Sequence, residues 1–228
     1  MVNPEILSFE YMKPIARKEP IRLFTDDRLE RLAHAQPAVP AIVWFAVSAA
    51  ALALALRQAP GMYILSAFVV GVIVWTLAEY LLHRFVFHLR SQKRGLRILG
   101  FMLHGIHHAQ PMVESRLVMP LAAGIPIALL FYSLFAGVAG AFLGAPHWVV
   151  PLFAGFIFGY EIYSFVHYAV HAYPRLKLLR GIRRHHLLHH GRDRTMRFGV
   201  SSPLWDVVFG TMPVPRHSTP RGGGNTPR

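Results

Sequence analysis

The stretch LVMPLAAGIPIALLFYSLFAGVAGAFLGAPHWVVPLFAGFIFGY, from Leu117 to Tyr160, contains no charged residue. A bilayer core of roughly 30 Å needs about 20 apolar residues for each helical crossing, so this stretch is long enough for two. Uncharged sequence also fills residues 37–56 and 58–78. The sequence therefore predicts four membrane crossings, at about 38–56, 61–82, 118–143 and 148–170.

The composition supports an all-α integral membrane protein. Of the 228 residues, 54% are hydrophobic and only 15% are charged, whereas a soluble domain carries about a quarter charged residues. There is no cysteine, which excludes disulfides, iron–sulfur clusters, thiolate-bound haem, cysteine zinc sites and a cysteine nucleophile. We expect one membrane domain over residues 37–213, preceded by an N-terminal segment, 1–36, and followed by a disordered tail, 214–228.

Turn-forming residues divide the crossings into two hairpins. Residues 58–61 (Gln-Ala-Pro-Gly) and 144–147 (Gly-Ala-Pro-His) predict two tight turns. The third crossing is rich in residues that mark kinks or close packing in membrane helices. These are Pro120, Gly124, Pro126, Gly137, Gly140 and Gly144.

The basic residues predict the orientation. Twenty-three of the 24 Lys and Arg residues lie in the N-terminal segment, the central loop or the tail, all on one side of the four crossings. The positive-inside rule places that side in the cytoplasm, with both termini and the central loop. Because topology and lipid headgroups account for the net charge of +13, we expect no nucleic-acid partner.

A short amphipathic helix is predicted before the first crossing. Thr25 is a candidate N-cap, two acidic residues follow it, and Leu29, Leu32 and Ala33 fall on one helical face. We interpret residues 25–33 as an interfacial helix on the cytoplasmic surface of the membrane.

Ten of the 14 histidines form four groups, all at the predicted cytoplasmic side. Residues three and four apart share a helix face, so two groups each present three imidazoles and a third presents two. The remaining pair is five residues apart and can converge only if the second crossing ends between its members. The groups are His83 and His88; His104, His107 and His108; His167 and His171; and His186, His189 and His190.

Ten nitrogen donors are too many for one ion and indicate two metals. Imidazole suits zinc, copper, iron and nickel, and the paired Glu-x-x-His motifs of carboxylate-bridged di-iron bundles are absent. A histidine-rich di-iron site at the membrane surface uses all ten donors. We expect His34, His147 and His217 to lie outside it, while His185, adjacent to His186, could replace that ligand.

Three carboxylates are candidates to support these histidines. Glu79 lies one turn before His83, and Glu161 and Asp206 lie near other groups. Each is expected to accept the second ring N–H of a ligating histidine. For Glu79 the alternative is an ordinary side chain that reaches toward the membrane interface.

These boxes together resemble the fatty acid hydroxylase (sterol desaturase) superfamily, and most closely its fatty acid 2-hydroxylase group. The boxes are EYLLHRFVFH at 79–88, HGIHH at 104–108, HYAVH at 167–171 and HHLLHH at 185–190. FGVS at 198–201 with LWD at 204–206 is similar to the C-terminal signature of that group, and PIRLF at 20–24 is similar to its approach to the first crossing. The resemblance covers residues 20–213.

The resemblance implies an O2-dependent hydroxylase that acts at the 2-position of long acyl chains of fatty acids or sphingolipids. It implies that the ten grouped histidines bind two metal ions, iron in the active enzyme and zinc in some purified or crystallised forms. Relatives often carry a fused cytochrome b5 domain with a His-Pro-Gly-Gly motif, which this sequence lacks. The resemblance therefore implies a separate electron donor, cytochrome b5-like or a ferredoxin.

Several alternatives stay open at this point. The same chemistry could act on a carotenoid, a sterol or an aminolipid headgroup, or could yield desaturation. A non-catalytic membrane protein that binds or transports metal is the alternative from another class, although transporters need mid-membrane polar groups that these crossings almost lack. The Ala/Arg/Pro-rich composition and the missing haem domain favour a bacterial inner membrane over the endoplasmic reticulum.

Overall fold

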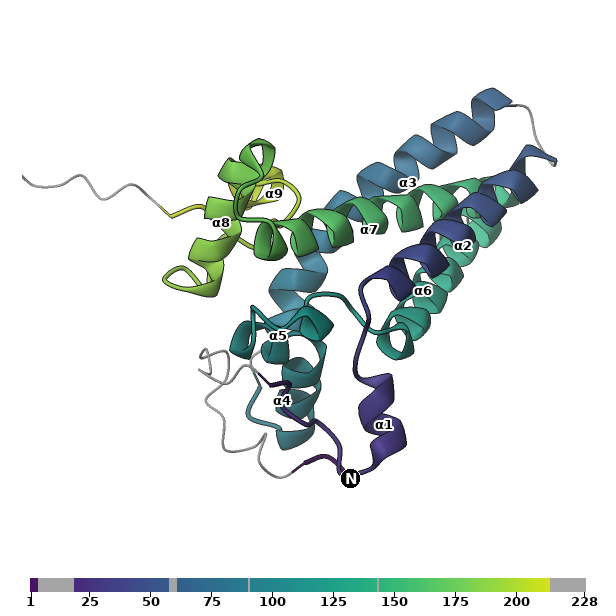
Figure 1. Cartoon of the computed structure of the whole chain (residues 1–228). Coiled ribbons are helices and arrows are strands. Elements are labelled where there is room, and N and C mark those ends of the chain that lie inside the picture. Colours follow the sequence, from purple (N-terminus) through teal and green to yellow (C-terminus); the bar gives the residue numbers. More distant parts are fainter. Residues whose placement is uncertain (4–18, 58–60, 90, 143, 214–228) are drawn as a thin grey trace, which may run out of the picture.

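The computed structural model describes residues 1–3, 19–57, 61–89, 91–142 and 144–213. Within these residues every regular element is a helix, and the one extended pairing is an isolated bridge between Val2 and Phe24. Four helical stretches are long and apolar enough to cross a membrane, at 38–56, 61–87, 114–142 and 146–172. The predicted all-α membrane fold is therefore confirmed (Figure 1).

The elements follow the predicted crossings closely. Because Pro120 caps it, the third crossing begins its α-helix at Leu121, and the second and third crossings run on into π-helical backbone. The elements are α1 (Asp27–Leu32), α2 (Ala38–Leu56), α3 (Gly61–Leu81), η2 (Leu82–Phe87), α4 (Arg94–Gly100), η3 (Phe101–Gly105), α5 (Ile106–Ala109), η4 (Glu114–Arg116), α6 (Leu121–Phe135), η5 (Ala136–Phe142), η6 (Pro146–Trp148), α7 (Val149–Ala172), η7 (Lys177–Leu179), α8 (Arg180–His190) and α9 (Leu204–Val208).

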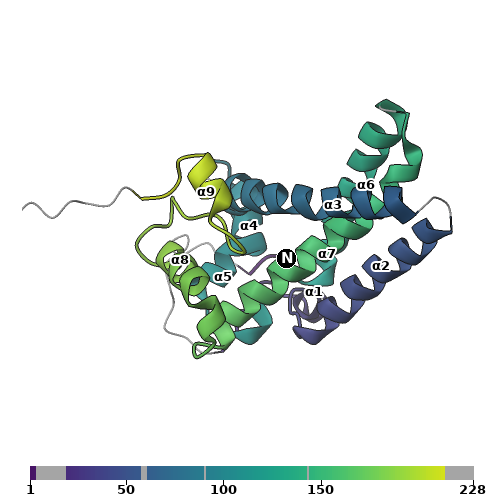
Figure 2. The same cartoon turned by 90° about the horizontal axis from the view of Figure 1, so that it is seen from above.

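Helix α7 is the centre of the membrane part. It packs along both α3 and α2, so the two helices of the first hairpin diverge from their shared end with α7 between them (Figure 2). The predicted turn at 144–147 is present and Gly144 has a positive φ of 62°, whereas residues 58–60 lie outside the described residues. The second hairpin is thus closed by a short turn, and the two hairpins are held together by the contacts of α7 with α2 and α3.

Glycines set how closely α3 and α7 approach each other. A Cβ atom added at Gly155 would lie 1.9 Å from the backbone oxygen of Phe68, and one at Gly71 would lie 2.1 Å from that of Leu152. In the third crossing, by contrast, a Cβ at Gly137 would meet no atom within 4 Å. The predicted close packing therefore occurs mainly in the second and fourth crossings, although Gly124 does lie against Trp44.

This packing predicts that Gly155→Ala destabilises the protein. The backbones of α3 and α7 must move apart to admit the methyl group, at a cost of about 1–3 kcal/mol or more. Thermal unfolding of the purified protein should show a clearly lower midpoint for Gly155→Ala. Gly137→Ala, which adds the same methyl group in open space, serves as the matched control, and equal midpoints for the two variants would contradict the packing described here.

The predicted helix before the first crossing is present as α1. Its N-cap is Asp26, whose carboxylate accepts the N–H groups of Arg28 and Leu29 at 2.9 and 3.0 Å, so the prediction of Thr25 as the cap is off by one residue. The Asp26 carboxylate, directly before the first turn, thereby satisfies two N–H groups that have no partner within the helix. Leu29 and Leu32 are exposed, as an interfacial helix requires.

Buried polar groups attach the N-terminal segment to the histidine-bearing end of the fold. Arg116 donates hydrogen bonds to the carbonyl oxygens of Ala33 and Ile21, and the Glu30 carboxylate accepts the N–H groups of Leu23 and Phe24. Burial alone would raise the pKa of Glu30. The hydrogen bonds lower the pKa by more than burial raises it, so it lies below the usual range. The segment thereby becomes one wall of the cavity described below.

Candidate metal centre

The ten grouped histidines converge into two sets of five. In each set the candidate ligand nitrogens all lie within 4.8 Å of one another, and each of the ten side chains is at most 8% exposed. One set, the first histidine group, consists of His83, His88, His104, His108 and His189. The other, the second histidine group, consists of His107, His167, His171, His186 and His190. The arrangement can hold two metal ions side by side.

Each His-x-x-His-His motif contributes to both groups. His104 and His108, four residues apart, join the first group, whereas His107 joins the second. In α8 the division is reversed, because His186 and His190 join the second group and His189 joins the first. Both motifs face the interior as predicted, but the i+3 member of each turns to the neighbouring group. The rings of His108 and His190 stack across the boundary, with centroids 4.1 Å apart.

A π-helical turn brings His83 and His88 together. The helical stretch ends at Phe87, between the two histidines as the sequence predicts, and its last turn, η2, is π-helical. The N–H of His88 donates to the carbonyl of His83 at 3.1 Å, which is the i to i+5 hydrogen bond of a π-helix. The π-helical turn itself was not predicted, because the spacing was interpreted with α-helical geometry only.

Backbone carbonyls orient three of the histidines. The Nδ1 atom of His83 lies against the carbonyl of Phe198, that of His167 is 2.9 Å from Leu117 O, and that of His189 is 2.7 Å from Met196 O. A carbonyl can only accept, so each Nδ1 carries the hydrogen and each Nε2 presents a lone pair. These Nε2 atoms point into the two groups, which is the arrangement of ligating histidines.

The nitrogen atoms inside the groups fit a bound cation. Nε2 atoms face one another at 3.0 Å between His83 and His104 and at 2.9 Å between His88 and His189. In the second group the Nε2 atoms of His107 and His167 are 2.9 Å apart. Lone pairs facing at these distances repel unless a proton or a metal ion lies between them. Neither ring nitrogen of His108 has a hydrogen-bond partner among the described residues.

Burial keeps these imidazoles neutral. It lowers the pKa of His104, His107, His108, His186 and His190 well below the ordinary value, and neighbouring imidazoles lower it further. Burial also lowers the pKa of His189, to about 4. Neutral imidazole is the form that ligates metals, and the donor set, ten nitrogens without a carboxylate, suits iron, zinc, copper or nickel.

The three predicted carboxylates do not contact the grouped histidines. Glu79 accepts the N–H groups of Val200 and Ser201 at 2.7 and 2.8 Å, and the Ser201 hydroxyl also donates to it. Glu161 contacts no histidine, and its Oε1 atom has no partner among the described residues. The predicted role was wrong because a chain segment distant in sequence, residues 198–201, occupies the space next to Glu79.

Asp206 holds the other half of the same segment. Its carboxylate accepts the N–H groups of Phe198 and Gly199, both at 2.8 Å, and bonds of 3.0 and 2.7 Å from His185 and Thr211. Glu79 and Asp206 together fix residues 198–201, the FGVS clamp, whose Phe198 carbonyl then orients His83. A Cβ at Gly199 would lie 2.1 Å from Ser202 O, so only glycine fits there. The carboxylates act on the metal centre through this clamp.

The position of His185 is resolved by the same contacts. Its Nε2 bonds to Asp206 and its Nδ1 lies 3.1 Å from Arg197, so it belongs to neither histidine group, whereas His186 belongs to the second. The carbonyls of Leu117, Met196 and Phe198 were not predicted, since a backbone acceptor leaves no residue-type pattern in the sequence. The FGVS and LWD motifs were the available indications of the clamp.

An apolar cavity of about 660 Å³ leads to the histidines. At one end it is lined by α1 and α4, through Leu29, Leu32 and Leu99, and at the other by deep membrane residues such as Phe131 and Phe156. Between these ends it reaches three of the grouped histidines. They are His104, His107 and His167. Its volume and its mostly apolar walls are typical of a small-molecule site.

The fold and the two histidine groups define a multi-pass membrane protein with buried, all-imidazole groups that could bind metal. Comparison with known proteins then gives the family. The fatty acid hydroxylase profile matches residues 68–211, and the chain belongs to this family. The predicted resemblance is confirmed, and with it the prediction of an enzyme, an oxidoreductase of the hydroxylase type.

Three curated relatives illustrate the similarity. The dihydroceramide fatty acyl 2-hydroxylase FAH1 of Arabidopsis thaliana is 34% identical, over 89% of this chain and 84% of its own length. The ceramide very long chain fatty acid hydroxylase SCS7 of Saccharomyces cerevisiae is 36% identical and the fatty acid 2-hydroxylase of Rattus norvegicus 37%. These matches cover 75% and 68% of this chain but only 44% and 41% of those proteins.

A solved structure shares the fold. Full-length scs7p, of which only the hydroxylase domain is visible, superposes with a TM-score of 0.78 at 34% sequence identity. The superposition covers 85% of this chain and 72% of that one. The similarity therefore includes both the membrane helices and the histidine-bearing end.

Proposed function

We propose that this protein is an O2-dependent di-iron hydroxylase that places a hydroxyl group on carbon 2 of a long acyl chain in a membrane lipid. The observation that carries the proposal is the apolar cavity, which runs from deep membrane residues to histidines of both groups. The names of the relatives, fatty acyl and fatty acid 2-hydroxylases, support the acyl chain as substrate and carbon 2 as the position.

In this proposal the ten grouped histidines are the metal ligands, five for each ion. Bound iron supplies the activation of O2 that breaks an unactivated C–H bond, a task beyond any side-chain acid or base. The chain's own residues hold ten lone pairs inward, keep water out through burial, and fix ring orientation through three backbone carbonyls. Zinc, which takes the same ligands, could replace iron in purified protein.

The cavity orients the substrate. Its deep part, near Phe131 and Phe156, is lined mainly by apolar side chains and suits the hydrocarbon tail. Its polar lining, including Ser115 and Arg116, lies beside Leu117, whose carbonyl holds His167. An acyl lipid with its tail in the deep part therefore presents the carbons next to its carbonyl to the histidines. Carotenoid, sterol and aminolipid substrates are the alternatives that the product analysis below distinguishes.

The cellular setting follows from the charges. The distribution of Lys and Arg supports cytoplasmic termini and a cytoplasmic histidine centre. We propose a bacterial inner membrane, with the endoplasmic reticulum as the alternative, and a separate electron donor, either a cytochrome b5-like protein or a ferredoxin. The described part of the chain contains the hydroxylase fold and no haem-binding domain.

The test is lipid analysis of a host that makes no 2-hydroxy lipids and expresses this chain. Mass spectrometry should reveal acyl chains that have gained one oxygen atom, and fragmentation should place it on carbon 2. A variant carrying His107→Ala and His108→Ala should yield none. Oxygen found instead on a headgroup, a sterol or a pigment would overturn the proposed substrate, and no new oxygen in iron-loaded cells would overturn the hydroxylase proposal.

Chain-length preference offers a separate prediction. Ala128 is buried on α6 and lines the deep part of the cavity, so Ala128→Phe should shorten the space for the tail. We expect activity on the longest acyl chains to fall at least about tenfold, while shorter chains are affected less. Ile125→Phe, on the exposed side of the same helix, is the matched control. An unchanged chain-length profile for Ala128→Phe would show that the tail lies elsewhere.

A further inference from the structure

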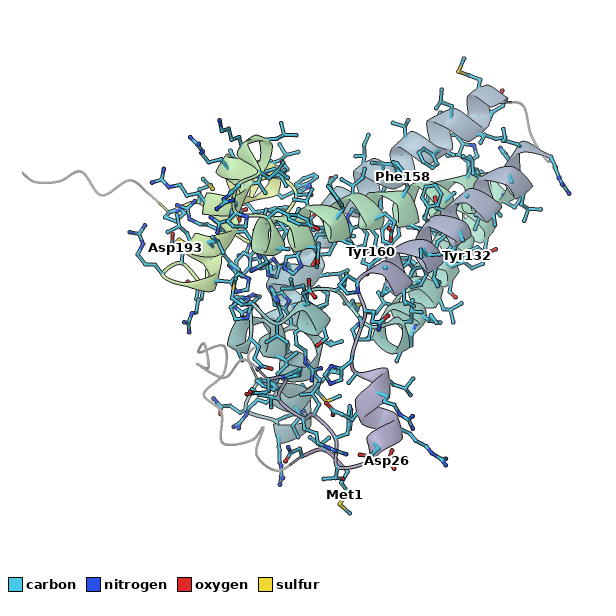
Figure 3. The ribbon with its side chains drawn as sticks, viewed as in Figure 1. Met1, Asp26, Tyr132, Phe158, Tyr160 and Asp193 are labelled. Carbon is cyan, nitrogen blue, oxygen red and sulfur yellow. The ribbon has the colours of Figure 1, made fainter. Side chains whose placement is uncertain are left out.

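A second hollow, about 690 Å³ in volume, lies on the outer surface of the histidine-bearing end. It is formed where the chain leaves α7, passes through η7 and enters α8, and five of its nine lining residues are basic. They are Arg175, Lys177, Arg180, Arg183 and Arg184, and we call this site the α8 basic hollow. Figure 3 shows nitrogen-bearing side chains gathered around α8, near Asp193, whereas the side chains around Tyr132 and Phe158 are almost entirely carbon.

No carboxylate in the described part of the chain compensates the charges of the hollow. Among the described residues none of the five basic side chains pairs with a carboxylate, and only Arg183 makes a hydrogen bond, from Nε to the carbonyl of Val170 at 3.0 Å. Five cations around one hollow repel one another and create a positive potential that attracts an anionic partner. Exposed Leu178 and Tyr173 beside them add apolar contact area.

Helix α8 is the wall between this hollow and the metal centre. Arg180 and Arg184 are exposed on one side of the helix, while His186 and His189 are buried on the other. The separation is therefore about one helix width, roughly 10–12 Å including side chains. Arg183 also ties the hollow to α7 at Val170, adjacent to His171 of the second histidine group.

The proposed reaction needs electrons from outside the chain. Insertion of one atom of O2 into a C–H bond consumes two electrons and two protons, and the second oxygen atom leaves as water. The chain has no cysteine for an iron–sulfur cluster. A protein that delivers electrons must approach the buried histidines closely, and the thin wall at α8 permits that approach.

We infer that the α8 basic hollow is the docking site of the small acidic one-electron carrier protein that reduces the metal centre, an inference that rests on the proposed function. A lipid headgroup is the competing occupant. The lipid-facing side of the cap is, however, the α1 side, where Leu29 and Leu32 are exposed at the cavity and α1 precedes α2. Helices α8 and α1 lie on opposite sides of α5 in both views (Figures 1 and 2).

The experiment measures reduction of the full-length, iron-loaded protein by stopped flow without oxygen, with the soluble haem domain of cytochrome b5 and an acidic [2Fe–2S] ferredoxin as probes. For the better donor, an Arg180→Glu, Arg184→Glu variant should be reduced at least about tenfold more slowly at low salt, and the wild-type rate should fall as salt rises. Arg28→Glu with Arg94→Glu makes the same charge change on exposed residues of α1 and α4 and should have little effect.

Three further outcomes are informative. Dithionite, which needs no docking site, should reduce all variants equally, and their metal content should match the wild type. Equal reduction rates for the α8 variant and its control would overturn the docking site. The docking site would also be overturned if the α8 variant no longer bound anionic phospholipid vesicles but was still reduced by the donor at the wild-type rate. If the dithionite-reduced wild type adds no oxygen to an acyl chain, the proposed function fails, and the donor rates still test the hollow.

Discussion

Replacing His108 with alanine should remove one of two bound metal ions, and replacing its neighbour His107 should remove the other. His108 belongs to the first histidine group and His107 to the second, although the two are adjacent in α5. Removing a residue that only orients a metal ligand typically lowers metal affinity or activity by about 10–100-fold. Removing a ligand itself should therefore lower them by about 100-fold or more. Metal content by mass spectrometry and product formation measure the two effects.

The discriminating control is His185→Gln. His185 is as buried as the ligands and precedes one of them, but it bonds to Asp206 and Arg197 outside both groups. The variant should keep both ions, as should His147→Ala, which lies far along the chain near a hairpin turn. A His185→Gln protein with one ion, or a His108→Ala protein with two, would contradict the division into groups.

The second large effect is expected for Asp206→Ala. This buried carboxylate accepts four hydrogen bonds, two of them from the backbone of the FGVS clamp. Without it the N–H groups of Phe198 and Gly199 are left buried and unsatisfied, and the Phe198 carbonyl no longer holds His83. We expect a loss of about 3–5 kcal/mol, which is a fall of roughly 6–20 °C in the unfolding midpoint, together with loss of metal from the first group.

Asp27→Ala is the matched control, because Asp27 is an exposed carboxylate in a surface ion pair with Arg22, worth about 0–1 kcal/mol. Its unfolding midpoint and metal content should stay close to the wild type. A midpoint for Asp206→Ala equal to that of Asp27→Ala would show that the clamp does not depend on Asp206.

The same residue predicts a pH dependence. Burial raises the pKa of Asp206, but bonds from His185, Thr211 and the backbone lower it more, so its pKa in the folded protein is below the ordinary value. A lowered folded pKa means that the stabilisation is complete above the unfolded value of about 3.9 and is lost as the pH falls through the lower folded value. The stability difference between wild type and Asp206→Ala should therefore shrink only below about pH 4.

The sequence was sufficient for the membrane crossings and for the histidines. The length of the uncharged stretch predicted both ends of α2, and the ligand spacing identified all ten histidines that converge. Both predictions depend only on residue types along one helix. The division of each His-x-x-His-His motif between two groups could not be predicted from the sequence, because it depends on how η3, α5 and α8 face one another. Orientation, cell compartment and the tail stay predictions.

The errors have local causes. His83 and His88 converge where the helix ends, as expected, but the π-helical turn between them was missed because its i to i+5 hydrogen bonding has no signature in α-helical spacing. Glu79 and Asp206 were expected to accept a ring N–H from ligating histidines, but both accept backbone N–H groups of residues 198–201, more than a hundred positions from Glu79. A contact between a side chain and a distant backbone segment has no signature in residue spacing.

The most direct test of the central claim supplies isotopically labelled O2 to the purified, iron-loaded and chemically reduced protein together with a long-chain acyl lipid. The account predicts that one labelled oxygen atom appears on carbon 2 of the acyl chain, and that proteins lacking either histidine group form no product. Labelled oxygen at another position or on another part of the lipid, or no incorporation while two irons are bound, would contradict it.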